Sequence, residues 1–317
     1  MSSIQKTNLF VLFLFVLQFI LGLFWSSLMT MVNMPIVINM ILSQICMFGI
    51  PTILYFIITK SNVKDTLSIK PISPLNILII VAISIFIQPI MTVLSALTTI
   101  FFPNNVTTML TETAKIPVWL TIIATALTPA IFEEIIFRGI VFSGYRTTSL
   151  LKASIMTGLL FGLIHCDAQQ FLYAFVMGIF FCFLVYRTGS IFASMISHFT
   201  INGSQVLLST ILMSSMSPEE LLKSTTNTNI SDIIASLISS IFLACITAPI
   251  LILLIWAFIK INKKPEIPEG KIYYNLPKQK QDFIAGKPLA GILLIYFLQV
   301  IIIPFAYIIV YVFQNIT

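Results

Sequence analysis

The residues best suited to chemistry lie in one otherwise apolar stretch of this 317-residue chain. Glu133 and Glu134 are adjacent carboxylates, Arg138 follows within the same stretch, and His165 and His198 are the only two histidines of the chain. Ionisable side chains inside a membrane-length apolar run are costly to bury and mark functional sites by default. Carboxylates and imidazoles are also the groups that most often move protons in catalysis. The stretch therefore predicts that these five residues build one site.

Helical spacing gives the two glutamates different roles. Glu134 and Arg138 are four residues apart, so on a helix they share one face and can form an ion pair. Glu133 is rotated by about 100° from its neighbour. The neighbouring apolar segments hold no second cation that could neutralise it. We therefore predict that Glu134 and Arg138 are structural and that Glu133 faces a cavity.

Two further pairs share a helix face in the same way. His198 and Asn202 are four residues apart, and Phe161 lies four residues before His165. Three successive helices would thus each carry one functional face to a common point. Phe161 is expected to pack and shape that point rather than to react.

These residues form three motifs that together resemble those of the CPBP family. That family comprises CAAX prenyl proteases of the Rce1 type, bacteriocin-processing enzymes and their relatives, and is also called the Abi family. The resemblance covers roughly residues 117 to 207, and the segment Tyr186–Ile191 before the last motif is similar too. The motifs are Glu133-Glu134-x-x-x-Arg138, Phe161-x-x-x-His165 and His198-x-x-x-Asn202. The resemblance implies an intramembrane endopeptidase that hydrolyses membrane-bound peptides or proteins, with prenylated or leader-peptide substrates as candidates.

Two kinds of peptidase chemistry stay open within this resemblance. In the first, Glu133 is the general base for an attacking water that His165 helps to hold, and His198 and Asn202 donate hydrogen bonds to the oxyanion. In the second, Zn²⁺ is bound by Glu133, His165 and His198, with water in its open position. The H-E-x-x-H spacing of common zinc proteases is absent from the sequence. Zn²⁺ is therefore an alternative and not a requirement.

Composition predicts the fold class independently of the motifs. The chain is 58% hydrophobic and 9% charged, with a mean hydropathy of +1.04, whereas soluble domains are about 25% charged. This composition predicts an all-α, polytopic transmembrane helical bundle in a lipid bilayer. The resemblance implies that this bilayer is a bacterial cell membrane. The net charge of +6 comes from basic residues spread over loops, so no nucleic-acid partner is expected. The four cysteines include no C-x-x-C pair, which argues against a disulfide scaffold.

About nine membrane spans are predicted, in three regions. Residues 1–116 hold the first three spans, residues 117–213 hold spans four to seven as the catalytic core, and residues 214–317 hold the last two with a basic linker at 262–287. The expected inner side carries 14 Lys and Arg residues and the outer side two. The positive-inside rule then puts the N-terminus inside and the C-terminus outside. The spans are expected at residues 9–31, 35–58, 75–102, 118–142, 152–166, 168–186, 191–213, 233–259 and 289–313.

Two other functions compete with the peptidase. A bacteriocin-immunity or resistance protein could use the same scaffold without catalysis, but all the motif residues are intact, which favours an enzyme. A transporter with a proton-relay carboxylate usually has repeated halves, and the sequence has no convincing internal repeat.

Overall fold

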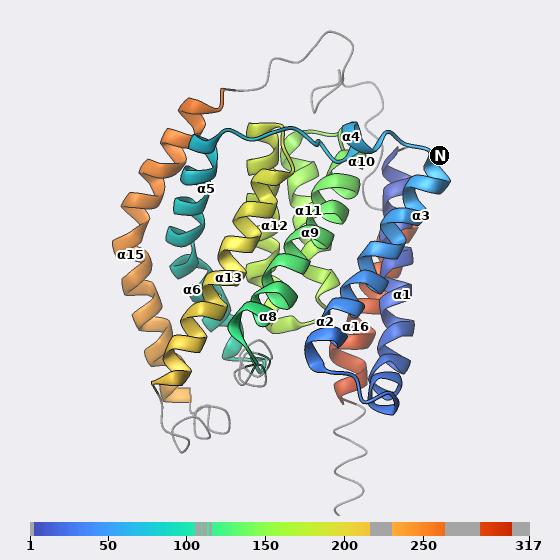
Figure 1. The fold of residues 1–317 in the computed structure, drawn as a ribbon, viewed down its shortest axis with the longest axis horizontal. Coiled ribbons are helices and arrows are strands. Elements are labelled where there is room, and N and C mark those ends of the chain that lie inside the picture. Colours follow the sequence, from blue (N-terminus) through green and yellow to red (C-terminus); the bar gives the residue numbers. More distant parts are fainter. Residues whose placement is uncertain are drawn as a thin grey trace, which may run out of the picture.

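The computed structural model describes residues 3–104, 109, 113, 116–215, 230–263 and 286–305. All the elements in these ranges are helices, which run side by side as a bundle (Figure 1). The predicted all-α fold class is therefore confirmed.

The helices follow the predicted spans in order. Several spans are divided by short π-helical turns, labelled η, so that one continuous rod carries more than one label. The rods and their connecting helix α4 are α1 (Ser3–Met31), α2–η1–α3 (Ile36–Gln44, Ile45–Gly49, Ile50–Thr59), α4 (Val63–Thr66), α5–α6 (Pro74–Phe86, Gln88–Thr99), α8–η2–α9–η3–α10 (Val118–Ile122, Ile123–Leu127, Thr128–Glu134, Ile135–Val141, Phe142–Gly144), α11 (Leu150–Ile164), α12 (Ala168–Thr188), α13 (Phe192–Ser214), α15 (Ile230–Ile261) and α16–η4 (Lys287–Phe297, Leu298–Ile302).

Seven helical stretches of the described chain are long and apolar enough to cross a bilayer, so this is a multi-pass integral membrane protein. The fifth predicted span, α11, has only 15 residues. The seventh, α13, is long enough but carries polar side chains and is not among the seven. The count of nine spans stays a prediction.

Several basic residues lie at one end of the bundle. The start of α1, the start of α5 and the ends of α3 and α15 lie together at one end of the bundle (Figure 1). Lys6, Lys60 and Lys260 belong to these helix ends. This arrangement agrees with the basic side expected to face inward, although most of the 262–287 linker lies outside the described residues. The orientation itself stays a prediction.

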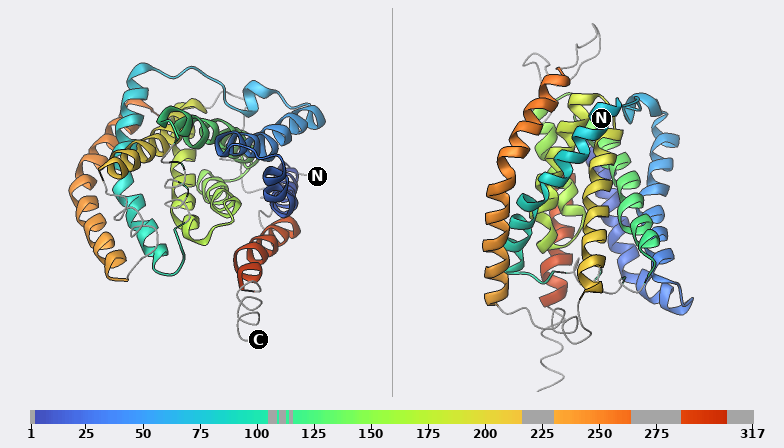
Figure 2. Two further views of the ribbon diagram at one scale, coloured as in Figure 1. Left: turned by 60° about the horizontal axis from the view of Figure 1, so that its bottom comes forward. Right: turned by 60° about the vertical axis from the view of Figure 1, so that its left-hand side comes forward.

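The centre of the bundle is formed by α9–η3, α11, α12 and α13, while α15 and α16 lie at its edges (Figure 2). The helices α11 and α12 approach closely because glycines face each other. A Cβ atom added to Gly178 would lie 2.6 Å from the Cα of Gly158. Small residues of this kind let helix backbones pack tightly within membranes. The close contact holds the helix that ends at His165 against the helix that follows it.

Candidate active site

The rod that carries the glutamates is broken just before them. Pro129 has no N–H to donate to the Thr125 carbonyl one turn earlier, and the π-helical turn η2 precedes it. Asn202 on α13 donates from Nδ2 to that carbonyl at 3.1 Å. Asn202 therefore satisfies the carbonyl that Pro129 leaves without its helical donor. One N–H of the Asn202 amide is thereby used in positioning α13 against the rod.

The ion pair predicted between Glu134 and Arg138 is present. Arg138 Nη1 lies 3.0 Å from Glu134 Oε1, and both side chains are fully buried. The guanidinium carbon of Arg138 lies 4.2 Å from the centre of the Phe161 ring and 4.8 Å from that of Phe181. A cation between two aromatic faces is further stabilised by their ring quadrupoles. Phe161 therefore packs against the ion pair, in line with its expected shaping role.

His198 joins this pair, which the sequence did not reveal. His198 Nδ1 lies 2.9 Å from Glu134 Oε1. An ionised carboxylate only accepts hydrogen bonds, so Nδ1 carries the proton and donates it. Glu134 thus binds Arg138 and His198 through one oxygen, and the Nε2 atom of His198 is left for the cavity.

Glu133 has a different environment, although it is the next residue. Its side chain is 7% exposed and lines a cavity. Its hydrogen-bond partner is the neutral amide of Gln44 on α2, whose Nε2 donates to Glu133 Oε1 at 3.1 Å. The prediction that the two glutamates face different surroundings is confirmed.

His165 stands at the end of α11, where the chain turns. Its Nδ1 lies 2.7 Å from the Phe161 carbonyl oxygen, which can only accept, so Nδ1 donates. The next residue, Cys166, adopts a left-handed backbone with φ of 46°. Gln18 on α1 donates to the Ile164 carbonyl at 2.8 Å, and the Cys166 thiol donates to Gln299 at 2.8 Å. Helices α1 and η4 thereby fix the turn that presents His165.

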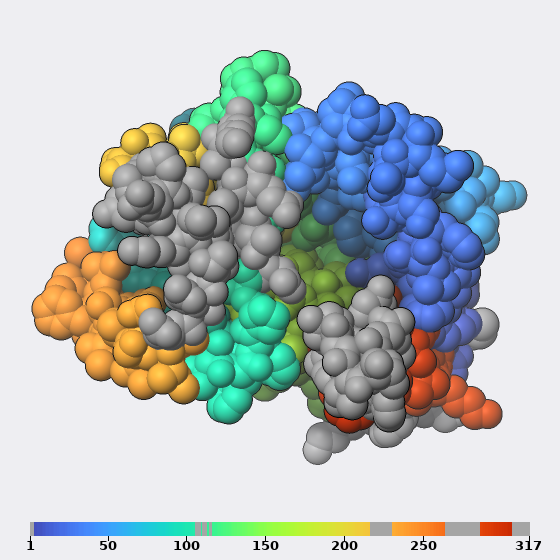
Figure 3. Space-filling model, turned by 90° about the horizontal axis from the view of Figure 1, so that it is seen from below, coloured from blue at the N-terminus to red at the C-terminus, as the bar shows by residue number. Residues whose placement is uncertain are grey.

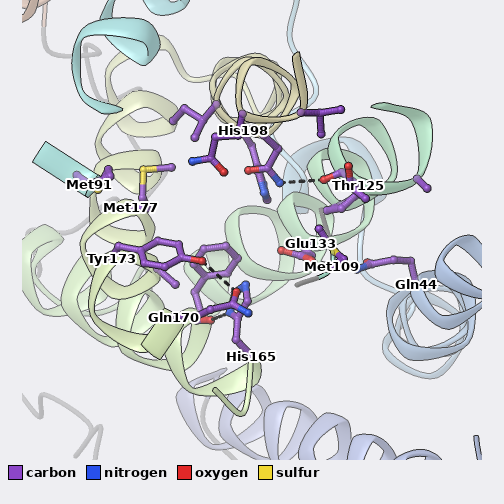
Figure 4. A pocket seen from close by; sticks show the side chains of 18 of the residues that line it. Gln44, Met91, Met109, Thr125, Glu133, His165, Gln170, Tyr173, Met177 and His198 are labelled. Atoms are coloured by element: carbon purple, nitrogen blue, oxygen red, sulfur yellow. Dashed lines mark hydrogen bonds between the residues drawn. The ribbon is translucent and has the colours of Figure 1, made fainter. Parts of the chain in front are cut away.

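The four residues predicted to be catalytic line one cavity of about 450 Å³: Glu133, His165, His198 and Asn202. Glu133, His165 and His198 reach it from three sides (Figure 4). Seen from below, the molecule is hollowed between α1–α2 and α6, with the central helices at the floor (Figure 3). The predicted convergence of the three helices is present, while the catalytic roles stay predictions.

The described residues leave the predicted Zn²⁺ site a prediction. Among them, no group of three His, Cys, Asp or Glu side chains is close enough to hold a metal ion. Glu133, His165 and His198 share a cavity without forming a three-ligand cluster. Both imidazoles use Nδ1 in a hydrogen bond, to Glu134 and to the Phe161 carbonyl, and keep Nε2 for the cavity. We therefore route no chemical step through a metal.

Sequence reasoning missed several residues of the site. Gln44 lies 89 positions before Glu133, and no spacing rule connects them. Its only signal was an amide inside an apolar segment. Gln170 and Tyr173 line the cavity from α12, where the Tyr173 hydroxyl donates to Gln170 Oε1 at 3.1 Å. Gln170 in turn donates to Asp167, the residue that caps α12.

Comparison with known proteins points to the same part of the chain. Residues 115–204 match the family model described as Type II CAAX prenyl endopeptidase Rce1-like. The central segment of this chain is thus similar to that family. The matched segment contains all the motif residues but excludes α1 and α2, which supply Gln18 and Gln44.

One curated relative matches a segment of similar length. The chain is 34% identical over 90 residues to a protein named "Putative membrane peptidase YdiL" from Bacillus subtilis (strain 168). The match covers 28% of this chain and 37% of the length of that protein. No solved structure matches the chain.

Proposed function

We propose that the protein is an intramembrane endopeptidase of the bacterial cell membrane that hydrolyses peptide bonds of membrane-associated peptides or proteins. The observation that carries this proposal is that Glu133, His165, His198 and Asn202 line one cavity inside a bundle of membrane helices. The Rce1-like match over the segment that holds all four residues supports it. So does the similarity to a protein named as a membrane peptidase.

Glu133 and His165 activate the attacking water in this proposal. Among the described residues Glu133 has the neutral Gln44 amide as its hydrogen-bond partner, so its carboxylate is free to take a proton, as a general base must. The Nδ1 atom of His165 is used by the Phe161 carbonyl. In the neutral ring, Nε2 then carries a lone pair that accepts a hydrogen bond from the water. The two groups together hold the water and remove its proton.

His198 and Asn202 stabilise the oxyanion of the tetrahedral intermediate. A charged His198 would donate through Nε2 while Glu134 compensates the ring through Nδ1. The buried charges of Glu133, Glu134, Arg138 and His198 then sum to zero. When Glu133 takes the proton, the negative charge moves to the oxyanion and the sum is unchanged. One such donor is worth about 3 kcal/mol in the transition state, and the second N–H of Asn202 adds another.

The cavity walls suit apolar segments of varied sequence. Met40, Met91, Met109 and Met177 all line the cavity. Methionine is flexible and polarisable, and it is common on surfaces that accept several partners. Prenylated peptides and leader peptides are both compatible with such walls, so the substrate class is proposed as an apolar, membrane-bound peptide.

The test compares the membrane peptides of cells that make wild-type protein with those of cells that make Glu133→Gln. The amide keeps the shape of the side chain but cannot take up a proton. We expect uncleaved substrates to accumulate in the variant at unchanged protein levels. Identical peptide profiles would contradict the proposal. A resistance phenotype that survives in the variant would favour the non-catalytic immunity function instead.

A further inference from the structure

A second cavity lies beside Glu133 and His165. It has a volume of about 320 Å³ and shares Ser43, Gln44, Glu133 and His165 with the main cavity. The volume is at the lower end of the range of about 300 to 1,000 Å³ that ligand pockets occupy. The residues proposed to activate water therefore stand where two cavities meet.

The walls of the second cavity are mainly apolar and come from the N-terminal helices. Leu21 and Trp25 on α1 face Met47 and Phe48 on η1. The Trp25 indole donates to Asn39 on α2 at 2.6 Å, which fixes this wall. None of these residues belongs to the segment that matches the Rce1-like family model. The N-terminal wall of the second cavity thus lies outside the matched segment.

One buried hydrogen-bond acceptor at the junction, Gln44 Oε1, has no donor among the described residues. Gln44 must turn its Nε2 toward the Glu133 carboxylate, which can only accept, so its Oε1 points away. That oxygen is buried and has no hydrogen-bond partner among the described residues. Buried polar atoms normally find a partner. A peptide N–H would satisfy the oxygen, whereas a lipid chain has no donor to offer.

We propose that the second cavity is the subsite for a large apolar side chain of the substrate peptide, next to the bond that is cut. The Gln44 Oε1 atom accepts a backbone N–H of the peptide at the junction, and the side chain enters between α1 and η1. This inference rests on the proposed function, because it places a substrate residue relative to Glu133.

Gly22 allows a direct test. It lines the second cavity and not the main one, and a Cβ atom added there meets nothing within 4 Å. Gly22→Phe should therefore fill the cavity without a clash in the fold, and Gly22→Ala is the matched control. Melting temperatures of both variants check that the fold is kept.

The substrate probe is a library of unlipidated synthetic transmembrane-segment peptides in detergent, with the cut sites read by mass spectrometry. For wild type and Gly22→Ala we expect cut sites enriched in Leu, Phe, Ile or Met at one flanking position. In an apolar pocket, one missing methylene lowers specificity by about 10- to 200-fold. Gly22→Phe should reduce that enrichment by at least about tenfold and continue to cut beside small residues.

Two results would overturn the inference. One is an unchanged cut-site profile in Gly22→Phe. The other is an equal loss at every site, as expected if the cavity holds a lipid chain. A failure of the proposed function gives a different result: wild type would then leave the library uncut, or Glu133→Gln would cut it as fast as wild type.

Discussion

The two faces of α9 place the same side-chain type in opposite surroundings. Glu134 is fully buried and bound to Arg138 and His198, with aromatic rings around the cation. Glu133, one residue earlier, lines the cavity, and its hydrogen-bond partner within the described part of the chain is the neutral Gln44. A rotation of about 100° thus separates a carboxylate that joins its own rod to α13 from one that is free to exchange a proton.

The difference shows how a membrane protein can hold a reactive carboxylate. Charges are expensive inside a bilayer and persist there when they are paired or face a cavity. Here the pairing is concentrated on Glu134, which leaves Glu133 uncompensated by a direct cation contact among the described residues. The following predictions test this difference between the two glutamates.

The largest expected effect on stability belongs to Glu134. Glu134→Gln leaves the Arg138 guanidinium without its counter-charge, and breaking one side of a buried pair costs about 3 to 5 kcal/mol. We expect a lower melting temperature and a lower yield in detergent. The double variant Glu134→Gln with Arg138→Met should recover much of both, because it removes the uncompensated charge. It should not recover cleavage, because His198 still lacks its carboxylate. Equal stability of Glu134→Gln and wild type would mean that the pair is not structural.

Gln44 should have a smaller effect that falls on activity. Gln44→Leu removes the hydrogen bond to Glu133, and a bond to a charged group is worth about 1.5 to 3 kcal/mol. We expect cleavage to fall by roughly 10- to 100-fold with little change in melting temperature. Gln88→Leu is the matched control, since Gln88 is another amide within a membrane helix, contacts Ser84 and Ser204, and does not line the main cavity. An unchanged cleavage rate in Gln44→Leu would show that Glu133 needs no positioning.

Metal removal should have the smallest effect. The described residues offer no three-ligand cluster, so we expect treatment with a chelator, followed by its removal, to leave the cleavage rate within about twofold of the untreated enzyme. The rate is to be measured on the same preparation before and after treatment. A loss of activity that Zn²⁺ restores would support the alternative in which Glu133, His165 and His198 bind the metal.

Residue spacing predicted the side-chain contacts within one helix and missed the contacts between helices. The i, i+4 pairing of Glu134 with Arg138 follows from helix geometry alone, and so does the rotation that turns Glu133 away from this pair. The contact of Glu134 with His198 joins residues 64 positions apart. It depends on how α9 and α13 pack, which no periodicity encodes. The hydrogen bond from Gln44 to Glu133 could not be predicted for the same reason.

The spans show a similar limit. Long apolar runs such as α1 and α15 were recognisable because much of their surface is apolar and exposed. The helices α11 and α13 are harder to count as spans, because one is short and the other carries the polar side chains of the site. The π-helical turns η2 and η3 also escaped prediction. They alter the local rise and phase of the rod on both sides of Glu133.

The central claim is that Glu133 takes the proton of the attacking water, whereas Glu134 stabilises the fold through Arg138 and His198. The most direct test is the cleavage rate of purified Glu133→Gln in detergent, measured together with its melting temperature. The account predicts a loss of about 10²- to 10⁴-fold in rate, the usual contribution of a general base, at a melting temperature close to that of wild type. Cleavage at the wild-type rate would contradict the account. Loss of the folded protein in Glu133→Gln, with Glu134→Gln stable, would show that the two roles are exchanged.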